Sequence, residues 1–127
     1  MKKQVDEQYC KKIVDKIYPI IAKDYNSNAK VELYSDIFTR LNGISAIDEY
    51  DSYAEYLWDS NKIILYTDNI DSKEDVIRSL IHECVHSKQC YEVYEAYYEC
   101  DLDYETHPYE IEAEYEEEKW INYKIKK

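Results

Sequence analysis

The sequence predicts an α+β domain, and three stretches of the chain carry this prediction. Apolar residues recur every three or four positions over 4–25, which is typical of an amphipathic helix. Two aromatic and β-branched runs within 50–66 flank a short polar break, which is typical of a β-hairpin. N-cap signals at 71–75 precede a second apolar periodic segment. We expect a small antiparallel or mixed sheet packed on this long second helix, with further helices at the N- and C-terminal ends.

The size and composition of the chain bound the remaining possibilities. Its 127 residues suit one ordinary domain, which we expect to span 1–127. The chain is 45% hydrophobic and 35% charged, with one glycine, which excludes low-complexity and linker-rich classes. Its apolar runs are far shorter than the roughly 20 residues that span a bilayer, and the N-terminus lacks the apolar centre of a signal peptide. We therefore expect a cytoplasmic protein without a membrane partner, with its four cysteines reduced.

The first half of the chain gives local predictions of differing sharpness. Pro19 should kink or end the last turn of the first helix. The alternation of residues in 30–34 predicts a short strand, and 37–41 suggests a brief helix or turn. The turn of the hairpin is expected at 59–61, where the sequence DSN has suitable length and chemistry.

The second helix has two alternative starts. Asp71 facing Glu74, or Ser72 facing Asp75, would form a capping box. From there the apolar face runs through 77–85, and the pattern predicts that the helix continues to about Cys100. This helix is expected to be the spine of the domain.

A last helix is expected from Pro108 to roughly Tyr123, because proline is favoured in the first helical turn. The formal net charge of -12 is concentrated in 92–118, which has acidic residues and no Lys or Arg. Such a surface repels phosphate backbones, so we expect no direct nucleic-acid binding, whereas basic partners would be attracted.

Residues 80–89 (LIHECVHSKQ) contain an H-E-x-x-H pattern in a chain with three histidines. His82 and His86 are four residues apart on one helical face, so one nitrogen of each can approach a common ion at about 2.1 Å. Glu83 lies about 100° around the helix axis, where it can reach a water in the open position of the ion. The pattern predicts a catalytic metal site with Glu83 as general base, against the alternative of a chance match on a solvated helix.

A catalytic zinc site needs a third protein ligand. Cys90 is excluded, since eight helical residues rise about 12 Å and separate it too far from His82. Three candidates remain, namely His107, Glu110 and Glu112. Glu110 and Glu112 lie about 200° apart around the axis of the last helix, so only one of them can face the ion. The residues alone leave the three candidates open.

The H-E-x-x-H pattern followed by E-x-x-A at 110–113 resembles the gluzincins, which are zinc metallopeptidases with two histidine ligands and one glutamate. The group includes the small minigluzincins and the ImmA/IrrE-like peptidases. The resemblance covers roughly 79–118 by motif. It implies a minimal zincin-like domain that binds Zn²⁺, with Glu110 as third ligand and Ala113 as the small residue that lets two helices approach. The asparagine of the family patterns N-E-x-x-A and E-x-x-A-N has no equivalent here.

The resemblance also implies how the site is supported. In these families an acidic residue four positions past the ligand holds the first histidine by its other nitrogen, which gives Glu114 that role. The substrate lies against the edge strand before the metal helix, which would be residues 63–68. A further donor to the oxyanion is expected from the mechanism. The candidates for it are His107, Tyr91, Tyr94 and Tyr109.

These inferences combine into one leading hypothesis and two alternatives. The leading hypothesis is a small zinc-dependent metallopeptidase, a protease that hydrolyses peptide bonds with Glu83 as general base. Its partner would be a peptide or protein substrate, such as a regulatory protein. The lysine-rich, arginine-poor usage is typical of an AT-rich genome, which is compatible with a mobile-element protein. The first alternative is an acidic protein-binding or DNA-mimic module that uses 92–118, with a structural or vestigial metal site. The second keeps zinc as a purely structural ion.

Overall fold

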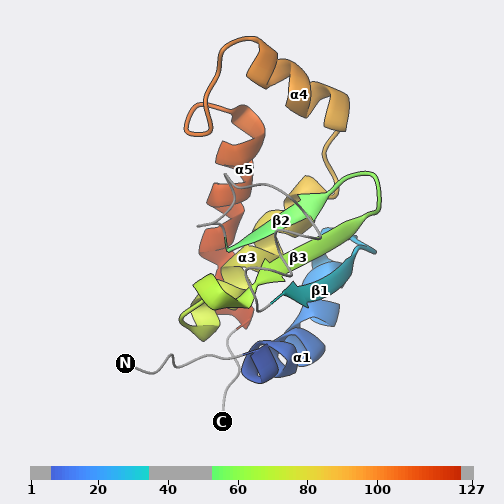
Figure 1. Ribbon diagram of the computed structural model, residues 1–127, viewed down its shortest axis with the longest axis vertical. Helices are drawn as coiled ribbons and strands as arrows, with labels where there is room; N and C mark the ends of the chain where they lie inside the picture. Colours follow the sequence, from blue (N-terminus) through green and yellow to red (C-terminus); the bar gives the residue numbers. More distant parts are fainter. Residues whose placement is uncertain (1–6, 35–52, 124–127) are drawn as a thin grey trace.

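The computed structural model describes residues 7–34 and 53–123, which form an α+β arrangement as predicted (Figure 1). The helices are α1 (Glu7–Tyr25), α3 (Lys73–His86), α4 (Tyr91–Glu99) and α5 (Pro108–Glu117). The strands are β1 (Lys30–Tyr34), β2 (Ala54–Leu57) and β3 (Lys62–Tyr66), and short 3₁₀ segments follow as η2 (Thr67–Asn69) and η3 (Glu118–Tyr123). The predicted helix or turn at 37–41 lies outside the described residues.

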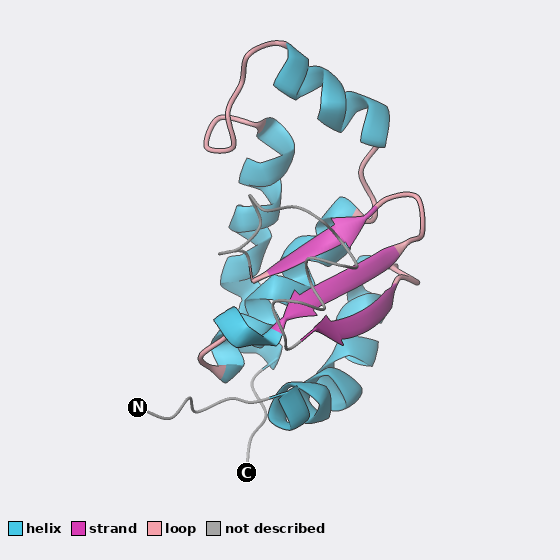
Figure 2. Ribbon diagram, viewed as in Figure 1, coloured by secondary structure: helices cyan, strands magenta, loops and turns pink. Residues whose placement is uncertain are grey.

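The three strands form a mixed sheet in the order β1-β3-β2 (Figure 2). β1 runs parallel to β3, and β2 runs antiparallel to it, so the predicted strand at 30–34 and the predicted hairpin are both confirmed. The hairpin turn ends at Asn61, whose φ of 55° lies in the left-handed region that asparagine tolerates. The Tyr56 hydroxyl donates a hydrogen bond of 2.6 Å to the Asn61 side-chain oxygen and fixes this turn.

The position of β3 corrects one expectation about the substrate. Residues 63–68 were expected to form an exposed sheet edge, but β3 is paired on both sides. Its residues 63–66 are buried, as suits a central strand that is covered on both faces. Within the described part of the sheet, the outer edges belong to β1 and β2.

Helix α1 packs against α3 with only part of the apolar face that the periodicity predicted, since Tyr9 and Ile20 are exposed. Cys10, Ile13, Ile17 and Ile21 are buried at spacings of three and four residues. Pro19 was expected to kink or end the helix. It lies inside the helix, which continues to Tyr25, so the expected end is wrong, and the kink stays a prediction. Ile17 before Pro19 and Ile21 after it are both buried in the core, so the last turns of the helix stay packed on the domain.

Helix α3 begins as one of the two capping alternatives predicted. The Ser72 hydroxyl accepts a hydrogen bond of 3.1 Å from the Asp75 backbone N–H, and the Asp75 carboxylate accepts one from the Asp71 N–H. From Val76 onward nearly every residue of the helix is buried. The helix is covered by the sheet, by α1 and by α5, which makes it the spine of the domain.

The expectation that this helix continues to Cys100 was wrong, because α3 ends at His86. The Ser87 hydroxyl donates a 2.6 Å hydrogen bond to the Cys84 carbonyl, and the N–H groups of Lys88 and Gln89 bond three residues back, which tightens the last turn. The backbone is extended at Cys90, and the separate helix α4 then begins. α4 has no buried residue and projects from the rest of the molecule (Figure 1).

Helix α5 begins with Pro108 in its first turn, as predicted. It packs along α3, and Ala113 is fully buried at that contact. The predicted end near Tyr123 is reached, but the last turns, from Glu118, are 3₁₀. All four cysteines are free thiols. Among the described helices, none combines the length and the apolar character needed to traverse a bilayer.

Candidate metal centre

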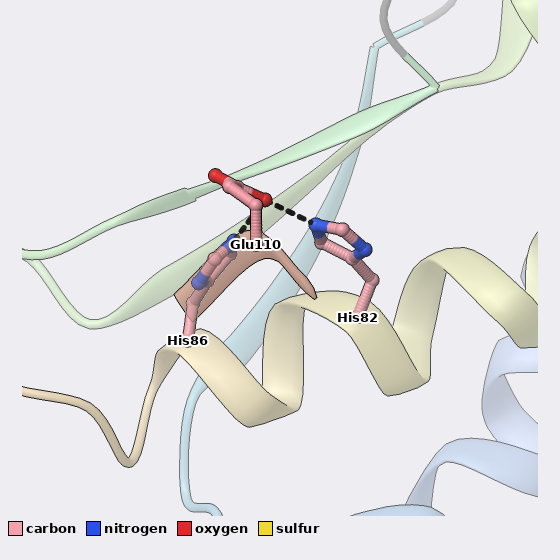
Figure 3. A group of neighbouring side chains, drawn as sticks. All are labelled: His82, His86 and Glu110. Carbon is pink, nitrogen blue, oxygen red and sulfur yellow. Dashed lines mark hydrogen bonds and ion pairs between the residues drawn. The ribbon is translucent and has the colours of Figure 1, made fainter. Parts of the chain in front are cut away.

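His82 and His86 of α3 and Glu110 of α5 converge on one point (Figure 3). The Nε2 atoms of His82 and His86 lie 2.9 Å and 3.1 Å from the same Glu110 carboxylate oxygen, Oε1. All three residues are buried, and one ligand atom from each lies within 4.8 Å of the others. The two imidazoles are one turn apart on α3, and the packing of α5 on α3 supplies the carboxylate. The group could therefore hold a metal ion.

The orientation of the His86 ring is fixed from its far side. Its Nδ1 lies 2.7 Å from the side-chain oxygen of Gln89. The amide nitrogen of Gln89 donates to the Tyr109 carbonyl and to the Glu112 carboxylate, so the oxygen of Gln89 must face the ring. Since that oxygen only accepts, Nδ1 of His86 carries a proton. The Nε2 atom of His86 is thus directed at the point of convergence.

The His82 ring is held in the same way by a different residue from the one predicted. Its Nδ1 lies 2.5 Å from the Glu117 carboxylate, which also lies 3.7 Å from the Arg78 guanidinium. Glu114, expected in this role, has an exposed side chain. The correction follows from helix geometry, because Glu117 is two turns from Glu110 and returns to nearly the same face, at the height of His82.

Negative charge at the convergence point favours a cation there. Burial lowers the pKa of His82, but the carboxylates of Glu110 and Glu117 outweigh burial and raise this pKa to about 10. Burial would raise the pKa of Glu110, but the two histidines hold it well below its usual range. The pKa of His86 is raised, since Glu110 and Glu83 outweigh its burial. The same field that favours protonated imidazoles favours a divalent ion.

Glu83 is the buried carboxylate beside this group. Its side chain is 5% exposed and faces the cavities that border the two histidines. Among the described residues it has no hydrogen-bond partner for its carboxylate. Burial raises the pKa of Glu83, and the nearby His82 and His86 oppose this shift. A buried carboxylate with a raised pKa that faces a cavity is suited to accept a proton from a molecule in the cavity.

Two cavities meet at His82 and Glu83. One, of about 470 Å³, is lined by all three converging residues. The other, of about 410 Å³, extends toward Arg78 and Asp75. Strand β2 borders both cavities through Ala54. The convergence point is therefore open to a molecule that lies along β2.

The tyrosines of the first cavity differ from most of those predicted. Tyr94 was among the expected candidates and lines it, and its hydroxyl donates to the second Glu110 oxygen. Tyr98 and Tyr104 also line it but were missed. Tyr98 is one turn from Tyr94 on α4, which the sequence could have indicated. Tyr104 comes from the segment between α4 and α5, where no periodic signal exists.

The other expected oxyanion donors lie elsewhere. His107 is fully buried, its Nε2 donates to the Tyr94 carbonyl, and its Nδ1 accepts from the Tyr109 N–H at the start of α5. The Nε2 contact thus holds α4 to the start of α5, and the Nδ1 contact caps α5. The Tyr109 ring packs on Tyr97 and lies outside both cavities. The Tyr91 ring packs on Trp58.

The candidate ligand Glu112, and Cys90, which was excluded on distance, both make contacts away from the two histidines. Glu112 is exposed, and its carboxylate accepts from Gln89 at 2.9 Å. The thiol of Cys90 is exposed and lies 3.3 Å from the Glu92 carboxylate. Neither residue belongs to the converging group, and neither does His107. Of the candidates that the sequence left open, the structure brings only Glu110 to the two histidines.

Two imidazoles and one carboxylate form a donor set that zinc accepts, and other first-row divalent ions also bind such sets. The outer contacts to Glu117 and Gln89 match the support usually found around metal-binding histidines. The residues present therefore fit a zinc ion.

Comparison of the chain with protein-family models, with curated proteins and with solved structures finds no match. The candidate site is thus defined by the contacts of its own residues.

Replacing Glu117 with glutamine is expected to weaken zinc binding by about 10- to 100-fold, because the charged partner that orients His82 is lost. Competition with a chromophoric chelator measures the affinity. Glu114→Gln removes the same charge from the exposed face of α5 and is expected to leave the affinity within about twofold of the original protein. An equal loss in both variants would mean that net charge, not the contact to His82, sets the affinity.

Proposed function

We propose that the protein is a zinc-dependent hydrolase of peptide bonds, a small metallopeptidase of the gluzincin kind. One observation carries the proposal. Two imidazole Nε2 atoms and a Glu110 carboxylate oxygen converge beside the buried carboxylate of Glu83, at a cavity bordered by strand β2. A structural metal site needs the two imidazoles and the Glu110 carboxylate, but it does not need a buried carboxylate beside them at an open cavity.

Zinc at this point would polarise the substrate carbonyl and lower the pKa of a water molecule toward about 7. Glu83 takes the proton of the attacking water and hands it to the leaving amine. Its burial keeps it from the bulk solvent, and its raised pKa lets it give the proton back. His82 and His86 keep fixed orientations through Glu117 and Gln89, so the reacting groups are held in place while the proton moves.

Tyr104 is the residue we propose as donor to the oxyanion. It lines both cavities beside Glu83. Tyr104 is 47% exposed as a whole, but partial desolvation on the cavity side and the surrounding carboxylates, Glu110 first among them, raise its pKa, so its hydroxyl stays protonated at neutral pH. Tyr94 is less suited, since its hydroxyl is already engaged by Glu110.

We propose that the substrate is an extended peptide segment that lies along the outer edge of β2. Ala54, Glu55 and Tyr56 of this strand line the cavity that contains the convergence point. Since no described strand pairs with this edge, an added strand would obtain backbone hydrogen bonds there. The family resemblance implied that the substrate lies along 63–68, which is β3, and we propose β2 in its place because β3 is central in the sheet. The physiological substrate would be a protein, such as a regulatory protein, in a compartment where thiols stay reduced.

The function is tested by metal analysis and by assay of the purified protein. We expect about one zinc ion per chain, and hydrolysis of an unstructured protein or peptide mixture, followed by mass spectrometry. Chelation should abolish the cleavage, and added zinc should restore it. Cleavage that survives complete removal of metal would exclude the proposed mechanism.

The second candidate function is an acidic binding module. It is favoured by α4, which has no buried residue and presents Glu92, Glu95 and Glu99. In that case zinc would act only on stability, so no peptide would be cleaved with or without zinc, and chelation would only lower the melting temperature.

A further inference from the structure

A third cavity adjoins the candidate metal centre. It has a volume of about 450 Å³ and lies where the β2–β3 hairpin faces the first turn of α4. The residues that line it are Tyr56, Leu57, Trp58, Asp59 and Tyr91. Tyr56 and Trp58 also line the cavity that contains the three converging residues, so the two cavities share a wall.

The shared wall lies close to the reacting groups. The ring of Trp58 lies 6.0 Å from that of His86 and 5.5 Å from that of Tyr94, between their centroids. A peptide along β2 whose scissile bond is near Glu83 would therefore have a neighbouring side chain within reach of this third cavity. The cavity is placed to select that side chain.

The chemistry of the cavity combines aromatic faces with negative charge. The Trp58 ring lies 5.0 Å from Tyr56 and 5.5 Å from Tyr91, and the Tyr56 hydroxyl is tied to Asn61, which fixes the ring. Asp59 supplies an exposed carboxylate at the rim. A side-chain hydrogen bond with Glu95 raises the pKa of the Tyr91 hydroxyl, and the charges of Asp59 and Glu92 add to this shift.

No lysine or arginine lines this cavity among the residues that the structure describes. Aromatic faces attract cations, and a carboxylate at the mouth adds a partner for the charged end of a long side chain. An apolar side chain would contact the aromatic rings but would form no ion pair with Asp59. An acidic side chain would be repelled.

We propose that this cavity binds the cationic side chain of a lysine or arginine next to the bond that is cut. The proposal rests on the function proposed above and specifies its substrate class as basic peptide segments. Trp58 and Tyr91 contact the aliphatic stem and the cation, and Asp59 pairs with the charged end.

The first experiment measures specificity by cleavage. Quenched fluorescent peptides that differ at one position, as arginine, lysine, norleucine or glutamate, are compared by kcat/KM, with the varied position placed in turn on each side of the cut bond. We expect arginine and lysine to exceed norleucine by about tenfold or more, the size of one charge-assisted contact. Asp59→Asn should remove most of this preference, so that the ratio of kcat/KM for arginine to that for norleucine falls toward one. Asp15→Asn, which removes one exposed carboxylate from α1, is the matched control.

The second experiment measures binding without cleavage. Trp120→Phe leaves Trp58 as the one tryptophan, and Glu83→Gln in the same chain prevents turnover. Quenching of Trp58 fluorescence by the arginine peptide and by its citrulline counterpart, which lacks the charge, gives the two affinities. We expect the arginine peptide to bind about tenfold more tightly, and Asp59→Asn to abolish the difference.

The two experiments separate the two proposals. Charge-dependent binding without any cleavage would support the cationic site and overturn the hydrolase. Cleavage with equal rates for arginine and norleucine would support the hydrolase and overturn the cationic site. Equal affinity for arginine and citrulline peptides, or an unchanged preference in Asp59→Asn, would also overturn it.

Discussion

Replacing Glu83 with glutamine is expected to lower kcat/KM for peptide hydrolysis by about 10³-fold while zinc content stays unchanged. The amide has nearly the shape of the carboxylate, so the buried position stays filled, but the amide cannot accept the proton of the attacking water. Glu83 has no hydrogen-bond partner among the described residues that would be disturbed, and His82 and His86 keep their outer contacts. Steady-state rates on a cleaved peptide, together with metal analysis of the same sample, check both halves of this prediction.

The matched control is Glu114→Gln, the same substitution on the exposed side of α5. It should leave the rate within about twofold of the original protein, as surface substitutions usually do. A Glu83→Gln protein with full activity would remove the general base from the mechanism. If no peptide is cleaved by either protein although zinc is bound, the acidic binding module becomes the better account.

Replacing Glu110 with glutamine is expected to weaken zinc binding by more than about 100-fold, since it removes a ligand and not only an outer partner. The carboxylate is buried and is contacted by His82, His86 and Tyr94, so these three groups lose their common charged partner. The affinity is measured by competition with a chromophoric chelator, and hydrolysis should fall with it.

Glu112→Gln is the control that separates the two neighbouring candidates on α5. Its side chain is exposed, and the amide oxygen of glutamine can still accept from Gln89, which keeps His86 oriented. We expect its zinc affinity to change by less than about threefold. The reverse ranking of the two variants, with Glu112 the more damaging, would show that the ion is held by another face of the helix.

The parts of the fold that local chemistry determines could be predicted from the sequence. The Ser72 cap, the hairpin turn at 59–61 and the first turn at Pro108 each depend on residues within a few positions of one another. The strand order could not be obtained in this way, because a hairpin alone does not say which of its strands will accept a third. The almost wholly apolar run KIIL of β3 was the signal for a central strand.

The candidate site divides in the same way. His82, Glu83 and His86 follow from helical spacing, since they lie on one helix. For the third ligand the residues alone left His107, Glu110 and Glu112, and the family resemblance chose among them. Glu117 and Tyr104 were not identified, because their roles depend on how α5 and the segment before it lie against α3. The end of α3 was missed because the apolar pattern continues into α4.

The contact between α3 and α5 has a consequence for how this protein can vary. Ala113 is fully buried there, and it lies one turn from Glu110. A larger side chain at this position would push the helices apart, and a displacement of about 1 Å between reacting groups can cost a hundredfold in rate. The size of the side chain at position 113 therefore also sets the distance between the Glu110 carboxylate and the two imidazoles. A substitution that tightened the packing there would therefore also change the geometry of the candidate metal centre.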